Sequence, residues 1–139
     1  MFDHILLHVS DIRASTTFYT AVLATLGHKV LVERPDSGVR GYGTSLPAKF
    51  WVTPASPDTN LPGPVHIAFE AKDKAQVDAF YEAGLKAGAK ANGAPGPRPQ
   101  YLLIFMRVFC WMRMGIILSA VAMCRLLDLA DICGLRSNF

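Results

Sequence analysis

Cysteine is missing from the first 109 residues of this 139-residue chain, and no glutamate follows Glu82. The three cysteines lack the spacing of a metal-binding motif, and their odd number argues against a disulfide scaffold. Lysine and arginine form no run and the net charge is only +3, so we expect no nucleic-acid partner. The first residues do not pair a basic region with an apolar stretch, as a secretory signal does. We therefore expect a cytoplasmic protein.

The composition is that of a globular domain. Hydrophobic residues make up 51% of the chain and charged residues 18%, which excludes a disordered segment. A chain of 139 residues is long enough to bury its own core. We expect one domain over residues 1–139.

The strongest signal is an internal repeat with a period of 62 residues. Seven positions between 4 and 23 carry the same residue 62 positions later, among them His4 and His66. The others are Ile5, Asp11, Phe18, Tyr19, Ala21 and Leu23. A repeat of this length indicates one supersecondary unit used twice. It also predicts that two histidines at matched positions approach one shared site.

Hydrophobic periodicity predicts that both units begin with a strand followed by a helix. In the first unit, residues 1–53, we expect a strand, a helix capped by Ser10-Asp11 and ended by Gly27, and three strands. The expected strands are 3–10, 28–33, 39–44 and 48–53. A proline-rich linker at 54–64 leads to a second unit at 65–101. It has a strand at 65–71, a helix from Asp73 to Gly88 and a loop at 91–100.

The composition changes abruptly after Tyr101. Residues 101–139 contain no lysine, glutamate or proline, but all three cysteines and four of the five methionines. The stretch 102–124 is apolar enough to suggest a membrane helix, although Arg107 and Arg113 argue against insertion. We expect no membrane partner, and favour a buried or aggregation-prone mixture of strand and helix.

The repeated segments resemble the vicinal oxygen chelate superfamily, which includes glyoxalase I, bleomycin resistance proteins and extradiol dioxygenases. The segments that carry the resemblance are DHILLHVSDIRASTTFYTAVLATLG at 3–27, PVHIAFEAKDKAQVDAFYEAGLKAG at 64–88 and NGAPGPRPQY at 92–101. The resemblance implies an α+β fold in which paired βαβββ modules form a curved, partly open barrel. It leaves the second module incomplete or altered after Tyr101.

The resemblance also implies a divalent metal ion, either Zn, Fe, Ni or Mn, with His4 and His66 as ligands. The superfamily usually completes this set with a glutamate on the last strand of the second module, and no such residue is present. Cys110, Asp128 and Asp131 are alternative ligands. Such a metal acts as a Lewis acid on substrate oxygens or activates dioxygen.

A slipped reading frame is one explanation for the missing glutamate. Consider the reading frame in which each codon consists of the last base of one residue's codon and the first two bases of the next. In this frame the bases that encode residues 109–112 must read Leu-Leu-Asp, and those that encode Met114-Gly115 must read Gly. The bases between and after them permit the remainder of Leu-Leu-Asp-Ala-Asp-Gly-Asn-Asn-Ile-Glu. We therefore favour an out-of-frame tail at 102–139, with a genuine but divergent C-terminus as the alternative.

Four further residues are candidates for substrate binding. His8 has the same strand parity as His4, and a packed, hydrogen-bonded histidine is the alternative. Trp51 is a candidate pocket wall, and Arg40 and Tyr42 are candidates for an anionic substrate or for an exposed strand face. No residue is assigned as catalytic.

Two classes of function fit these patterns. The first is a metal-dependent lyase, isomerase or dioxygenase of the glyoxalase type that acts on a small oxygenated substrate, impaired by loss of the glutamate. The second is a metal-free protein that binds a small molecule, as drug-resistance proteins do, and a nonfunctional truncated product is a third possibility. We expect a homodimer in either functional case.

Overall fold

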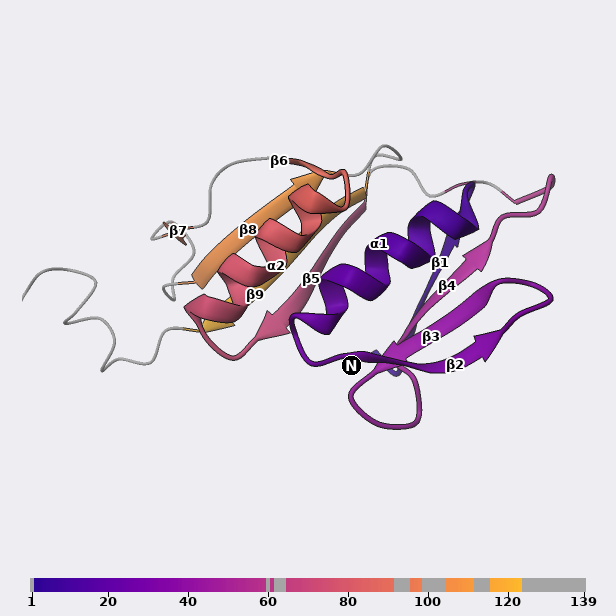
Figure 1. Ribbon diagram of the computed structural model, residues 1–139, viewed down its shortest axis with the longest axis horizontal. Helices are drawn as coiled ribbons and strands as arrows, with labels where there is room; N and C mark the ends of the chain where they lie inside the picture. The colour runs from indigo at the N-terminus through magenta and orange to yellow at the C-terminus, as the bar shows by residue number, and fades with distance from the viewer. Residues whose placement is uncertain are drawn as a thin grey trace, which may run out of the picture.

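The computed structural model describes residues 2–59, 61, 65–91, 96–98, 105–111 and 116–123 (Figure 1). These residues form an α+β fold of two sheets, each with one helix. The first module contains β1 (Ile5–Val9), α1 (Ile12–Ala24), β2 (Lys29–Arg34), β3 (Val39–Gly43) and β4 (Phe50–Pro54). The second contains β5 (Val65–Ala71), α2 (Lys74–Lys86), β6 (Lys90–Ala91), β7 (Gly96–Arg98), β8 (Phe105–Trp111) and β9 (Ile116–Met123).

The two sheets have the same strand order, as the repeat predicts. In the first sheet the order is β1-β4-β3-β2, with β1 and β4 parallel and the other pairs antiparallel. In the second it is β5-β9-β8-β6, with β5 and β9 parallel and β7 paired to β8. The strands of the described residues curve without closing into a barrel (Figure 1).

Matched aspartates begin the two helices. The Asp11 carboxylate accepts a hydrogen bond from the Ala14 backbone N–H at 2.9 Å, and the Asp73 carboxylate accepts one from Gln76 at 2.8 Å. Each therefore satisfies one of the backbone donors that a helix leaves free at its first turn. Gly27 and Gly88 follow the helices with φ of 80° and 93°, a conformation that glycine adopts without strain.

The region after Tyr101 supplies two strands of the second sheet. β8 pairs with β9 from Phe105 to Trp111, and β9 pairs with β5 from Val65 to Ala71. The membrane-helix interpretation of 102–124 is wrong for 105–111 and 116–123, because these residues are extended. None of the helices in the described ranges is long and apolar enough to cross a bilayer. Residues 102–104, 112–115 and 124 lie outside the described part.

One hydrophobic core serves both modules. α1 and α2 lie side by side, and the inward faces of both sheets contribute to the same cluster of buried residues (Figure 1). A row of aromatic rings crosses the junction, with centroid distances of 5.0 Å for Tyr19–Phe50, 5.3 Å for Phe50–Phe69 and 6.3 Å for Phe69–Phe80. Such edge-to-face and tilted ring contacts stabilise the fold by more than the burial of their apolar surface alone.

His28 lies at this junction. Its ring is 6.4 Å from the Phe69 ring and is partly buried. Burial lowers the pKa of the His28 imidazole, because a low-dielectric environment disfavours the charged form.

We expect Phe50→Ala to reduce the free energy of unfolding by about 3–5 kcal/mol, since it removes a buried ring that contacts both modules. Phe2→Ala is the matched control, because Phe2 is 89% exposed, and should change stability by less than about 0.5 kcal/mol. Denaturant unfolding monitored by circular dichroism measures both. Equal effects of the two substitutions would contradict the shared core.

We also expect His28 to make stability depend on pH. The folded-state pKa lies below that of the unfolded chain, so the unfolded state binds the proton more readily. The contribution is complete above the ordinary histidine pKa of about 6.5 and is lost as the pH falls through the lowered folded-state value. Between about pH 8 and 5, the wild type should lose more stability than His28→Gln. If the free energy of unfolding depends on pH equally in the wild type and in His28→Gln, this role of His28 is refuted.

Candidate functional site

Alternation along β1 and β5 separates a core face from an outer face in each sheet. Leu7 and Val9 of β1 are buried, as are Ile67 and Ala71 of β5. Side chains of the opposite parity therefore lie on the faces away from the helices. On this parity are His4, Leu6 and His8 at β1 and His66, Ala68 and Glu70 on β5. The two repeated histidines thus occupy equivalent outer positions.

His4 is oriented by its neighbour Asp3. The His4 Nδ1 atom is 2.9 Å from one Asp3 carboxylate oxygen, and Lys49 Nζ donates to the other at 3.2 Å. The hydrogen bonds from His4 and Lys49 lower the pKa of the Asp3 carboxyl. An ionised carboxylate only accepts, so Nδ1 of His4 is the donor and carries the proton. A neutral His4 then has its lone pair on Nε2.

The described residues provide two donors of the predicted metal set but not the third. His66 is exposed on β5 and pairs in register with Ile117 of β9. Neutral imidazoles suit a divalent transition metal. The described part contains no group of three histidine, cysteine, aspartate or glutamate side chains that could hold one. The fit is therefore partial, because β9, IILSAVAM, carries no carboxylate.

Of the three alternative third ligands, the structure places only the backbone of Cys110. Cys110 belongs to β8, at the register position opposite Leu118 of β9. Asp128 and Asp131 lie outside the described residues.

The structure places His8 and Trp51 on the same outer face of the first sheet. In the parallel pairing of β1 and β4, Leu6 is opposite Trp51 and His8 is opposite Thr53. His8 is partly buried, and its Nδ1 atom has no hydrogen-bond partner among the residues that the structure describes. Buried polar atoms are rarely left unpaired, so this atom is a candidate contact for a ligand.

The Trp51 ring is held in place from two sides. Its Nε1–H donates to the Ala48 carbonyl at 3.1 Å. Gly41 is opposite Trp51 in the register, and a Cβ atom at Gly41 would be 2.9 Å from the indole Cζ3 atom. The ring therefore covers the glycine, and any side chain there would displace it.

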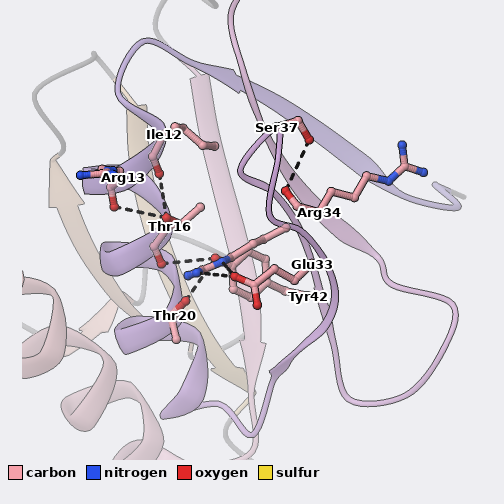
Figure 2. Close-up of polar contacts among 9 residues, drawn as sticks. Ile12, Arg13, Thr16, Thr20, Glu33, Arg34, Ser37 and Tyr42 are labelled. Carbon is pink, nitrogen blue, oxygen red and sulfur yellow. Dashed lines mark hydrogen bonds and ion pairs between the residues drawn. The ribbon is translucent and has the colours of Figure 1, made fainter.

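Tyr42 and Arg40, the two candidates for an anionic substrate, lie on the opposite side of the sheet from Trp51 and His8. Tyr42 is 1% exposed, and its hydroxyl lies 3.2 Å from Thr20 Oγ1 and 3.3 Å from the Thr16 carbonyl (Figure 2). Burial raises the pKa of this phenol despite the Thr20 contact. Arg40 donates from Nε and Nη2 to Glu33 Oε1 at 2.9 and 2.6 Å. Both side chains share the face of α1.

Sequence reasoning missed Asp3, Lys49 and Thr53. The parity of Trp51 is a signal for the last two, because residues 49, 51 and 53 of one strand share a face. No pattern indicates the Asp3–His4 contact, since side chains of adjacent residues rarely meet.

Comparisons with known proteins agree with this fold. A family model described as the Glyoxalase/Bleomycin resistance protein/Dioxygenase superfamily matches residues 1–110. A glyoxalase/bleomycin resistance protein from Albidiferax ferrireducens T118 is 26% identical with a TM-score of 0.75, over 88% of this chain and 98% of that one. A lactoylglutathione lyase from Agrobacterium tumefaciens is 16% identical with a TM-score of 0.60, over 88% and 92%, and supports the fold alone. No curated protein matches the sequence significantly.

Two tyrosine substitutions test the placement of Tyr42 in the core. Tyr42→Phe should destabilise the protein by about 0.5–1.5 kcal/mol, because it removes the hydroxyl contacts with Thr20 and Thr16. Tyr19→Phe is the matched control, since the Tyr19 hydroxyl is buried without a partner in the described residues and its removal should be neutral or stabilising. Thermal unfolding measures the stability of both variants. A larger loss of stability in Tyr19→Phe than in Tyr42→Phe would contradict the placement of Tyr42 in the core.

Proposed function

The chain belongs to the glyoxalase/bleomycin resistance protein/dioxygenase superfamily, and from this premise we propose that it binds a small oxygenated molecule with the help of a divalent metal ion. His4 and His66 would hold the metal. The proposal includes catalysis of the lyase, isomerase or dioxygenase type, at a reduced level because the carboxylate ligand is missing from β9.

The oriented imidazole of His4 is the observation that carries this proposal. Histidine ligands in metal sites commonly donate their other ring N–H to a carboxylate, which fixes the tautomer and the direction of the lone pair. The contact from His4 Nδ1 to Asp3 matches this arrangement, and Lys49 balances the charge of the carboxylate. His66 occupies the matched position of the second repeat and is exposed on the outer face of β5.

Different residues of the chain would bind the substrate and orient the metal ligands. A divalent metal would supply Lewis-acid polarisation of the substrate oxygens. Asp3 keeps the lone pair of a neutral His4 on Nε2. Trp51 and Leu6 would cover the substrate with apolar surface, and His8 would lie beside it on the same face.

A metal-free binding protein is the second candidate. It is favoured by the absence of a three-donor group from the described ranges. In that case the outer face with Trp51 and His8 binds its ligand alone, and the His4–Asp3 pair acts as a surface contact. The homodimer and the cytoplasmic location expected from the sequence remain part of both proposals.

Metal titration separates the two candidates. We expect the metal-stripped protein to bind Zn²⁺, Ni²⁺ or Mn²⁺ in isothermal titration calorimetry, and His4→Ala or His66→Ala to weaken binding by at least about 10-fold, because each removes one of two donors. Asp3→Asn should weaken it by about 10-fold, since it leaves both ligands but loses the orienting carboxylate.

His28→Gln is the control for this experiment, because it removes a histidine that lies at the module junction and should leave metal affinity unchanged. Circular dichroism checks that each variant is folded. If the wild type takes up no metal, or if His66→Ala binds metal as the wild type does, the two-histidine site is wrong.

A further inference from the structure

We infer that two copies of the chain associate through an apolar surface at one end of the first sheet. This surface is defined by Phe2, Leu46 and Pro47, and we call it the apolar tip. The inference rests on the proposed function, which includes a homodimer, and it names the surface that joins the two copies.

The apolar tip contains the most exposed hydrophobic side chains of the described residues. Phe2 is 89% exposed and Leu46 is 70% exposed, more than any other large hydrophobic side chain in the described ranges. Lys49 connects their two segments, because its Nζ donates to Asp3 at 3.2 Å and its carbonyl accepts from the Ile5 backbone N–H at 2.8 Å. The start of the chain and the loop between β3 and β4 are therefore neighbours (Figure 1). Adjacent exposed apolar side chains of this kind mark interaction surfaces.

The loop between β3 and β4 is fixed at both ends, which holds Leu46 in place. Ala48 is buried, and its carbonyl accepts a hydrogen bond from Trp51 Nε1–H at 3.1 Å. At the other end, a Cβ atom at Gly43 would be 3.2 Å from the Ser45 carbonyl oxygen, so the loop turns back closely over the end of β3. A side chain that already has its bound position loses little conformational entropy on association.

The charges beside the apolar tip favour a second copy of the chain as the partner. Asp3 and Lys49 lie next to each other, and their side chains are 78% and 54% exposed. A surface that carries one charge of each sign is self-complementary across a two-fold axis, because Asp3 of one copy can face Lys49 of the other. An anionic lipid surface would match only the lysine of this pair and would repel the aspartate.

Association by extension of the first sheet at β2 is disfavoured. β2 is an edge strand of that sheet, and its register with β3 shifts between Val30 and Val32. The strand also carries Lys29, Glu33 and Arg34. A bulge and charged side chains protect an edge strand from pairing with another chain. The apolar tip is therefore a better contact surface than this edge.

The small size of the apolar tip predicts a weak dimer. A standard interface has about 20–30 residues on each side, whereas the tip offers three apolar side chains with the Asp3–Lys49 pair beside them. We expect a dissociation constant of about 10⁻⁴ M. Well below this concentration the protein is monomeric, and substitution of Phe2 then leaves its unfolding unchanged.

Sedimentation equilibrium with EDTA present tests the apolar tip. The wild-type mass should rise from that of a monomer toward that of a dimer as the protein concentration passes about 10⁻⁴ M. Phe2→Ser and Leu46→Ser should each raise the dissociation constant by at least about 10-fold, because both copies lose an apolar side chain from the contact. Leu85→Ser is the control, since Leu85 is exposed on α2, and should change nothing. If both tip variants associate as the wild type does, the surface is wrong.

A pair of charge reversals tests the two-fold arrangement. Asp3→Lys leaves two cations beside each tip and Lys49→Glu leaves two anions, so each variant alone should associate about 5-fold more weakly than the wild type. An equal mixture of the two variants should recover the wild-type affinity to within about 2-fold, because each cation then faces an anion of the other copy. No recovery on mixing would overturn the inference.

Wild-type NMR keeps the test decisive if a tip variant fails to fold. The backbone amide resonance of Leu46 should shift between dilute and concentrated samples, and that of Leu85 should not. Concentration-dependent shifts at Leu85 without any at Leu46 would refute the contact at the apolar tip.

The same measurements separate this inference from the proposed function and from a membrane partner. A dimer that persists in both tip variants rejects the apolar tip and leaves the homodimer, whereas a wild type that is monomeric at every concentration rejects both. A dimer that the tip variants lose, in a protein that takes up no metal, supports the inference and rejects only the metal part. Binding of a monomeric wild type to phosphatidylglycerol vesicles, strengthened by Asp3→Lys, would assign the tip to a lipid surface and overturn the inference.

Discussion

The edge-on contact of Phe50 with Phe69 is the interaction on which the arrangement of the two modules depends. Phe50 belongs to β4 and Phe69 to β5, so this pair joins two sheets that share no strand pairing in the described residues. It extends through Tyr19 and Phe80 into both helices. Because this row occupies the helix side of both sheets, the repeated histidines and Trp51 are left on the other side.

The sequence was sufficient to predict the elements that repeat. Identities at a spacing of 62 residues, with Asp11 and Asp73 as helix caps, identify two copies of one unit, and the structure has both caps in place. Periodicity was less useful after Tyr101, because a short apolar run is compatible with either a strand or a buried helix. Pairing of β9 with β5 decides this question, and pairing is not visible in composition.

The orientation of β3 could not be predicted from its sequence alone. Its sequence, VRGYG, alternates polar or aromatic residues with glycines, and this pattern suggests that Arg40 and Tyr42 face solvent or a ligand. The glycines are on the outer side, because Gly41 lies under the Trp51 ring, and Tyr42 is consequently turned toward α1. Alternation separates the two faces of β3 but does not say which one is turned to the helix, and the contact of Gly41 with Trp51 and Ala48 distinguishes them.

The contact between Gly41 and Trp51 also bears on how this face can change during evolution. A side chain at position 41 has no space, because its Cβ atom would lie 2.9 Å from both the Trp51 Cζ3 atom and the Ala48 Cβ atom. Positions 41, 48 and 51 are therefore coupled, and a smaller ring at position 51 alone does not make room for a side chain at position 41. Related chains with a side chain at position 41 should differ from this one at both position 48 and position 51.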